Sequence, residues 1–265
     1  IFTSMEVMKK KRPDIEAVDI TTDSGSHHLV AEMAFDLGYN VLCEKPLSLT
    51  IRGCNRVIDA WKRSGKVLSV GEQERRDPMV RLNKALLDSG AIGDPYSFLL
   101  GSARGGNDII IWPWRHYKNI GGIFVDAGVH AVDQMMYYLG DIEEVYAVSK
   151  IWEPKRYKGE KIGVANFYEH WANEVPDEID ATAEDMVIST LKFKNGAVGQ
   201  WTSFWAAHGE TTEYAMIYGS KGSMAPAKQR RGDPLKLTID GVGEVSGDAV
   251  LELVPDFHLD ELPAR

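Results

Sequence analysis

The sequence has 265 residues, a formal net charge of −9 and an isoelectric point of about 5.3, with the 44% apolar and 26% charged content typical of a soluble globular protein. This acidic balance offers no basic field for phosphates, which argues against a nucleic-acid partner. The sequence has no apolar run of the roughly 20 residues that a membrane span needs, no secretory signal before the first expected strand, and only two cysteines, without disulfide or metal-site spacing. We therefore expect a cytoplasmic protein with no metal site.

The first 72 residues alternate β-forming runs with helical patterns. Strands are expected at residues 17–21, 40–44 and 67–70, and helices at about 4–11, 27–37 and 50–64. Thr3 and Glu6 have the spacing of a capping box at the start of the first helix, and Gly38 follows the second, where helices commonly end. This alternation predicts βαβ units and a parallel sheet.

The pattern changes near Gly71, and strands then dominate. Helices are expected at 78–89 and 124–139, a polar and aromatic loop at 104–119, and strands at 96–104, 145–152, 185–193, 197–205, 213–219 and 235–239. Asn195 and Gly196 between two of these runs predict a hairpin turn. We expect an α/β protein of two domains, with the parallel sheet in residues 1–72 and an α+β domain with a large, mainly antiparallel open sheet in residues 73–265.

A lysine follows the second expected strand. Residues 41–46 read Val-Leu-Cys-Glu-Lys-Pro, so Lys45 stands at the carboxyl end of a buried strand, where open α/β sheets hold their ligands. Pro46 fixes the backbone behind it by locking φ. Glu-Lys-Pro also occurs by chance in surface turns, and its position after a buried strand is what favours a role for Lys45 as a donor to a substrate oxygen.

An aspartate and a histidine stand four residues apart in the expected 124–139 helix. Asp126 and His130 would project from one face of that helix, and a carboxylate one turn away can orient an imidazole that acts as a general base. Gly128 between them leaves room for a close approach. The alternative on spacing alone is a surface pair with only an electrostatic role.

Aromatic and hydrogen-bonding residues gather in the loop before this helix, namely Trp112, Trp114, Arg115, His116 and Tyr117. Rings can stack on the C–H face of a sugar, and Arg115 can bind hydroxyls or a carboxylate. A packed domain-closure loop is the alternative interpretation. His208 ends an expected strand, from which it could line the pocket.

Taken together, these stretches resemble the Gfo/Idh/MocA oxidoreductases, the family of glucose–fructose oxidoreductase and inositol dehydrogenase. The resemblance rests on segments in the family's order, namely 17–22 with His27, 41–46, 70–71 with 75–78, 114–115, 121–122, 126–133, 193–199 and 218–223. It implies a Rossmann-type first domain, of which residues 1–72 are the C-terminal part. It also implies an NAD(P)-dependent oxidoreductase that moves a hydride between a nicotinamide cofactor and a secondary alcohol of a sugar, sugar derivative or cyclitol.

The resemblance also implies roles for individual residues. His130 would take the hydroxyl proton, Asp126 would orient it, and Lys45 would polarise the oxygen near the nicotinamide. Cofactor contacts are expected from Thr22, Asp23, Ser24, His27, Glu44 and Lys45. Substrate contacts are expected from Arg75, Trp114, Arg115, Asp133 and His208. A homo-oligomer, dimer or tetramer, is expected through the C-terminal sheet.

The sequence departs from the family pattern in several places. Asp23 and Ser24 replace the usual Pro-Asn, and Glu72 and Glu74 replace typical aromatic and basic residues. The family's opening strand and G-x-G-x-x-G turn are absent from the sequence, which suggests a fragment and leaves NAD and NADP both open. Two other functions remain open: a cofactor-retaining NAD-dependent glycosidase, and a non-catalytic sugar-sensing relative. The sequence does not identify the substrate.

Overall fold

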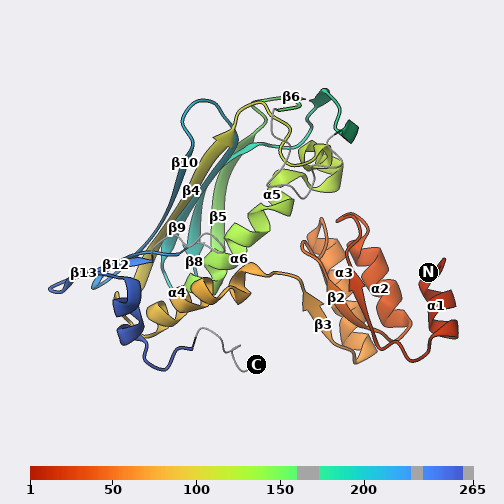
Figure 1. Cartoon of the computed structure of the whole chain (residues 1–265), viewed down its shortest axis with the longest axis horizontal. Helices are drawn as coiled ribbons and strands as arrows, with labels where there is room; N and C mark the ends of the chain where they lie inside the picture. The colour runs from red at the N-terminus through yellow and green to blue at the C-terminus, as the bar shows by residue number, and fades with distance from the viewer. Residues whose placement is uncertain (160–172, 228–234, 259–265) are drawn as a thin grey trace. The chain divides into compact units, whose positions relative to one another are not determined.

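The computed structural model describes residues 1–159, 173–227 and 235–258, which form two compact units (Figure 1). The first unit contains Ile1–Glu72 and Tyr117–Val129, and the second contains Gln73–His116 and His130–Arg265. The first unit thus includes a segment, Tyr117–Val129, that the sequence pattern assigned to the second domain.

The first unit is built on a three-stranded parallel sheet in the order β1-β2-β3. Its elements are α1 (Met5–Lys11), β1 (Ala17–Ile20), α2 (His27–Asp36), β2 (Asn40–Cys43), α3 (Ile51–Ser64), β3 (Leu68–Val70), the 3₁₀ turn η3 (Lys118–Ile120) and α5 (Gly122–Asp126). Its core joins the sheet to α2 and α3 through small and branched side chains such as Ala31, Ala34, Val41 and Val57. The predicted parallel sheet is confirmed.

Local chemistry accounts for the helix ends in this unit. Thr50 caps α3 by accepting a hydrogen bond from the Gly53 amide, and Gly65 ends it in the left-handed conformation with φ 66°. The prediction that Thr3 caps the first helix was wrong. Ser4 is the cap and accepts from the Val7 amide, because it is Ser4 that immediately precedes the first helical residue.

The second unit is built on an eight-stranded sheet in the order β13-β12-β11-β10-β4-β9-β8-β5. Its strands are β4 (Pro95–Gly105), β5 (Ile142–Lys150), β8 (Met186–Phe193), β9 (Val198–Ala207), β10 (Thr212–Gly219), β11 (Gly222–Ala225), β12 (Lys236–Ile239) and β13 (Gly243–Ser246). Every neighbouring pair is antiparallel except β4 and β9, so the expected mainly antiparallel sheet is confirmed. Asn195 and Gly196 form the predicted turn between β8 and β9, with Gly196 at φ 89°.

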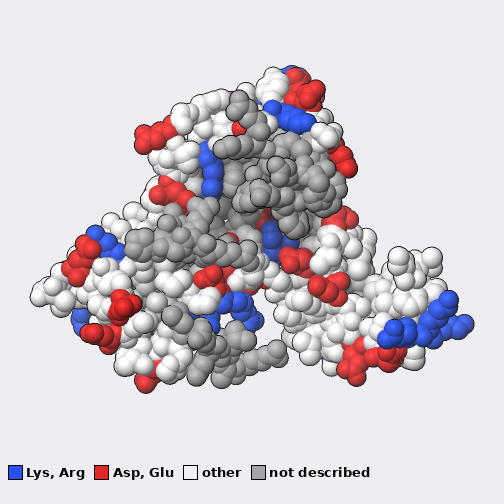
Figure 2. Space-filling model, viewed as in Figure 1, with Lys and Arg blue, Asp and Glu red and all other residues white. Residues whose placement is uncertain are grey.

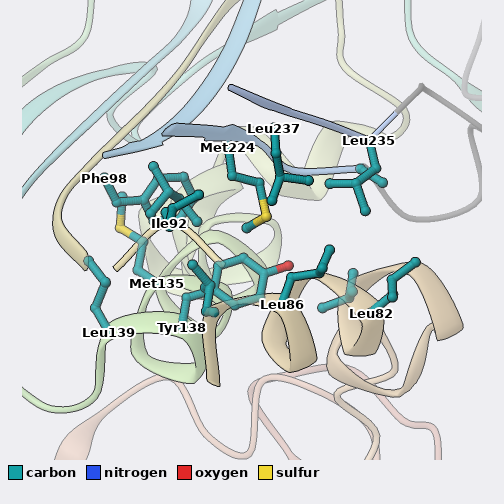
Figure 3. Close-up of a cluster of buried hydrophobic side chains, with 14 of the residues drawn as sticks. Leu82, Leu86, Ile92, Phe98, Met135, Tyr138, Leu139, Met224, Leu235 and Leu237 are labelled. Carbon is teal, nitrogen blue, oxygen red and sulfur yellow. The ribbon is translucent and has the colours of Figure 1, made fainter. Parts of the chain in front are cut away.

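Two helices cover one face of this sheet, α4 (Pro78–Asp88) and α6 (Gly128–Leu139) (Figure 1). Leu82 and Leu86 of α4 and Met135 and Tyr138 of α6 point toward the strands that carry Phe98, Met224 and Leu237 (Figure 3). Leu86, Met135, Phe98, Met224 and Leu237 are at most 2% exposed. The second unit also contains the turns η1 (Glu74–Arg76), η2 (Pro113–His116) and η5 (Gly247–Leu253) and a small antiparallel sheet of β6 (Lys155–Tyr157) and β7 (Glu178–Asp180).

The prediction of one continuous helix over residues 124–139 was wrong. The chain forms α5, leaves regular helix at Ala127, and starts again as α6 at Gly128. The Ala127 amide still bonds to the Ile123 carbonyl at 2.8 Å, so the interruption is local. Gly128 lowers the cost of such a break, because glycine loses more backbone freedom than other residues when it is held inside a helix.

The surface carries both signs of charge. Lys9, Lys10 and Lys11 lie in the last turn of α1, where cations suit the helix dipole, and acidic and basic side chains are interspersed over the face in Figure 2. Among the helices of the described residues, none is long and apolar enough to cross a membrane.

Candidate functional site

Lys45 lies just beyond the end of β2 and is bound to Asp126 at the end of α5, within the first unit. Its Nζ donates to the Asp126 carboxylate at 2.9 Å and to the Asp126 backbone oxygen at 2.7 Å. Both side chains are largely buried, at 18% and 11% exposed. An ammonium has three N–H donors, so two of them are oriented by one residue and the position of Nζ is well defined.

The His27 ring contacts the loops that follow β1 and β2. Its Nδ1 lies 2.7 Å from the Pro46 carbonyl oxygen and its Nε2 lies 3.0 Å from the Thr22 carbonyl oxygen. The ring is 1% exposed, and the Lys45–Pro46 bond is cis. His27 therefore contacts backbone oxygens on both sides of its ring, one of them in the turn that carries Lys45.

Polar groups line the carboxyl end of the parallel sheet. Asp23 Oδ1 accepts from the Ser26 amide at 3.1 Å, and hydrogen bonding from Ser26 lowers the pKa of the Asp23 carboxyl. The Ser26 hydroxyl lies 2.8 Å from Thr22 Oγ1. Thr22, Asp23 and Glu44 remain exposed at this edge, which is where open parallel sheets bind ligands. These donors and acceptors fit the ribose and amide groups of a nicotinamide cofactor.

In the second unit, Glu74 of η1 faces two residues of α6. His130 Nδ1 lies 3.8 Å from Glu74 Oε1, and Gln134 Nε2 donates to Glu74 Oε2 at 3.3 Å. His130 and Glu74 are 15% and 13% exposed. The carboxylate of Glu74 thus lies beside the predicted base, a contact that the sequence pattern did not indicate. The four-residue spacing of His130 and Gln134 was the available signal for a shared partner.

Two predicted substrate-binding residues bind each other. Arg75 Nε donates to Asp133 Oδ2 at 2.8 Å, and Arg75 Nη2 donates to the other carboxylate oxygen. The Arg75 guanidinium also lies over the Tyr137 ring, 5.4 Å from its centroid. This two-point contact ties η1 to α6 next to Glu74.

The aromatic loop has a stacked outer part and a buried inner residue. The Arg115 guanidinium lies over the Trp114 ring, 4.3 Å from its centroid. His116 is 3% exposed, and its Nε2 accepts from the Ile110 amide at 2.8 Å. Burial, aided by the positive charge of Arg156, lowers the pKa of His116 to about 4 from 6.5. His116 therefore belongs to the interior that supports the loop.

His208 lies in an open pocket of about 310 Å³ lined by Gly105, Gly106, Asn107, Asp108, Ala207, His208, Gly209 and Thr211. Its Nε2 lies 2.9 Å from Glu153 Oε1. The buried Arg156 supports the pocket, since its Nη1 donates to the carbonyls of Gly106, Asp108 and Trp205 while its Nη2 donates to Asp185. Among the described residues, no group of three or more His, Cys, Asp or Glu side chains could hold a metal ion.

Two family models match the chain. Residues 1–72 match "Oxidoreductase family, NAD-binding Rossmann fold", and residues 80–225 match "GFO/IDH/MocA C-terminal domain". The two matches together span most of the sequence.

Proteins with similar sequences are dehydrogenases, in agreement with the two family models. The chain is 31% identical over 232 residues to levoglucosan dehydrogenase of Pseudarthrobacter phenanthrenivorans, covering 83% of this chain and 57% of the relative. It is 26% identical to myo-inositol 2-dehydrogenase of Thermotoga maritima, covering 79% of this chain and 56% of the relative. A solved structure of levoglucosan dehydrogenase in complex with NADH and L-sorbose is 28% identical, with a TM-score of 0.75, and covers 93% of this chain and 64% of that one. The chain thus spans less than two thirds of each.

Proposed function

We propose, from the premise that the chain belongs to the GFO/IDH/MocA oxidoreductase family, that the protein is a dehydrogenase that oxidises a secondary alcohol of a sugar, sugar derivative or cyclitol. The observation that carries this proposal is the Lys45 ammonium, oriented by Asp126 at the carboxyl end of β2. Two relatives are named levoglucosan dehydrogenase and myo-inositol 2-dehydrogenase, and these names support a sugar or cyclitol as the substrate.

NAD is the cofactor that we propose. Thr22, Asp23 and Ser24 after β1, with Glu44 and Lys45 after β2, would hold its nicotinamide half, and His27 would support both turns from beneath. When bound, this cofactor supplies the acceptor for the hydride. The NADH complex of the levoglucosan dehydrogenase structure favours NAD over NADP.

The residues of the chain would then handle the proton and the oxygen. We assign the general base to His130, which takes the hydroxyl proton as the carbon is oxidised. Lys45 donates its remaining N–H to the substrate oxygen and stabilises the charge that develops there. Asp126 holds the Lys45 ammonium in place through its carboxylate and its backbone oxygen. The stacked Trp114 and Arg115 offer a face and donors for the substrate ring.

The test is the activity of Lys45→Ala in the complete protein that carries this chain. Reduction of NAD would be followed spectroscopically with a panel of sugars and cyclitols that includes levoglucosan and myo-inositol. We expect turnover to fall roughly 10²–10⁴-fold, the usual range for a positioned acid–base group. Lys62→Ala, on the last turn of α3, is the matched control and should keep full activity. Near-normal turnover in Lys45→Ala would refute the assignment.

We also propose that the protein forms a homo-oligomer through the face of the eight-stranded sheet opposite α4 and α6. The strand register puts Tyr146, Val148, Ile188, Tyr214 and Tyr218 on one face. These side chains are 37–75% exposed, and apolar rows of this extent are characteristic of interfaces between subunits. The partner that we propose is a second copy of the same chain, in a dimer or a tetramer.

The oligomer is tested by analytical ultracentrifugation. Ile188→Lys with Tyr146→Lys should reduce the sedimenting mass to that of one subunit, because two charges would be buried without partners. The control is Val67→Lys, an exposed apolar residue of the first unit, which should leave the mass unchanged. A wild-type protein that sediments as a monomer would contradict the proposal.

A further inference from the structure

The guanidinium of Arg104, near the end of β4, lies over the indole ring of Trp205 in β9, 4.8 Å from its centroid. Trp205 is a fixed platform, because its amide donates to the Asp185 carbonyl at 2.7 Å and its carbonyl accepts from Arg156 Nη1 at 2.8 Å. The pairing of β4 with β9 shifts register here, so that Arg104 faces both Trp205 and Ala206. Irregularities of this kind re-aim side chains and are frequent next to active sites.

Arg104 has no carboxylate partner, in contrast to Arg75 and Arg156 of the same unit. Arg75 binds Asp133 and Arg156 binds Asp185, whereas no ion pair or hydrogen bond within the described residues involves the Arg104 guanidinium. The side chain is half-buried, and Nε alone of its nitrogens is shielded from solvent. Nη1 and Nη2 therefore remain as two parallel donors that a ligand can reach.

Arg104 lies on the face of the sheet that α4 and α6 cover. Successive side chains of a strand alternate between faces, and Phe98 and Leu100 of β4 pack in the core beneath these helices. Tyr138, near the end of α6, lies against Phe98, with ring centroids 5.9 Å apart. From this contact β4 continues for about 20 Å to Arg104, while α6 runs back along the sheet for about 12 Å to His130 (Figure 1). The guanidinium and the proposed base therefore lie toward the same end of the second unit.

These features fit an anionic group on a substrate. A cation that is partly removed from water without a counter-charge is unfavourable, and an anion bound to it offsets that cost. Two parallel N–H donors match the two oxygens of a carboxylate. A phosphate group carries close to two negative charges at neutral pH, and one guanidinium balances only one of them. A carboxylate is therefore the better match for Arg104.

We propose that Arg104, held by Trp205, is a specificity-determining residue that binds the carboxylate of a sugar acid, the substrate class that the protein prefers over neutral sugars. The inference rests on the proposed function and narrows its substrate. The carboxylate takes no part in the chemistry: the hydride still leaves the secondary alcohol carbon for NAD, and the hydroxyl proton still goes to His130.

The first test compares substrates that share a ring. The complete protein that carries this chain is assayed for NAD reduction with D-glucuronate against D-glucose, and with D-galacturonate against D-galactose. We expect kcat/KM to be about 10–100-fold higher for an acid than for its neutral partner, the range for hydrogen bonds to a charged group. Added salt should reduce this advantage by screening the charges. Equal values within both pairs would overturn the proposal, and so would faster use of D-glucose 6-phosphate than of D-glucuronate.

The second test changes the arginine. Arg104→Gln should raise the KM for the acid about 10–100-fold with kcat nearly unchanged, because the carboxylate lies away from the reacting carbon, and should leave kcat/KM for the neutral sugar as it was. Arg104→Lys keeps the charge without the parallel donors and should recover part of the loss. Arg63→Gln, the same change at an exposed arginine in the last turn of α3, should match the wild type. An equal loss for the acid and the neutral sugar in Arg104→Gln would show a structural role and overturn the proposal.

Binding separates this inference from the proposed function. Calorimetry gives the Kd of the same acids and neutral sugars for the wild type and Arg104→Gln. If the wild type binds an acid more tightly and Arg104→Gln removes this preference, while no sugar reduces NAD, the anion site stands and the proposed function fails. If neutral sugars are oxidised as well as the acids, the proposed function stands and this inference fails. A wild type that binds neither acid more tightly than its neutral partner also overturns the inference.

A folding failure of Arg104→Gln, as judged by circular dichroism, leaves two measurements that decide. These are the salt dependence of the acid preference in the wild type and the acid preference of Arg104→Lys. We expect added salt and the lysine each to weaken the preference, and a preference that neither changes would overturn the proposal.

Discussion

The buried His116 makes the stability of the protein depend on pH in a predictable direction. Burial lowers the pKa of His116 to about 4 in the folded chain, whereas an unfolded chain has the ordinary value of 6.5. Between these two values the unfolded state binds a proton that the folded state does not. The stability that His116 contributes is therefore complete above about pH 6.5 and is lost as the pH falls toward 4.

The size of the effect follows from the two pKa values. At pH 5 the imidazole is almost fully protonated in the unfolded chain and about one tenth protonated in the folded chain. The free energy of unfolding falls by about 1.4 kcal/mol for each pH unit below 6.5 in which only the unfolded chain is protonated. Between pH 7 and pH 5, His116 should therefore lower the free energy of unfolding by about 2 kcal/mol.

The assay compares urea unfolding at pH 7 and pH 5 for the wild type and His116→Gln. The glutamine oxygen can still accept from the Ile110 amide, which His116 Nε2 does in the wild type, but it does not titrate. All other titrating groups are shared, so the pH-dependent loss of stability should be about 2 kcal/mol smaller in the variant. Equal losses in the wild type and His116→Gln would refute the reasoning.

Two further predictions follow from buried groups. Arg156→Met should destabilise the second unit by about 3–5 kcal/mol in urea unfolding, because the Asp185 carboxylate stays buried without its ion pair; a loss below about 1 kcal/mol would contradict this. Burial raises the pKa of the Cys43 thiol to about 11, so iodoacetamide at pH 8 should not label Cys43 in the folded protein but should label it after denaturation, as peptide mass spectrometry would show. Rapid labelling of folded Cys43 would show that its site is open to solvent.

The sequence was sufficient for the architecture because its signals are local. Alternating β-forming and helical patterns predicted the parallel sheet of the first unit, and Asn195-Gly196 predicted the β8–β9 turn. The position of Lys45 at the end of a strand also follows from chain order alone. Two short strands were not predicted: β11 and β13 both begin with glycine, which is depleted in strands and typical of turns.

Tertiary structure decided which side chains meet. The carboxylate of Asp126 binds Lys45, 81 positions earlier in the sequence, a contact that no spacing in the chain indicates. Glu74 lies 3.8 Å from His130 in the fold, beside the contact between Arg75 and Asp133 that ties η1 to α6.

Local backbone signals and contacts between distant residues differ in how far along the chain they act. Backbone propensity, capping and hydrophobic period act over a few residues and are readable in the chain itself. An ion pair between distant positions depends on packing that no local pattern encodes. Arg75 and Asp133 illustrate this: each is a reasonable ligand for a substrate when considered alone, and only the folded chain shows that they bind each other. The sequence by itself determined the elements and the residue types of the site, and the fold decided their partners, because hydrogen bonds and charges act over a few ångströms in space, whatever the separation along the chain.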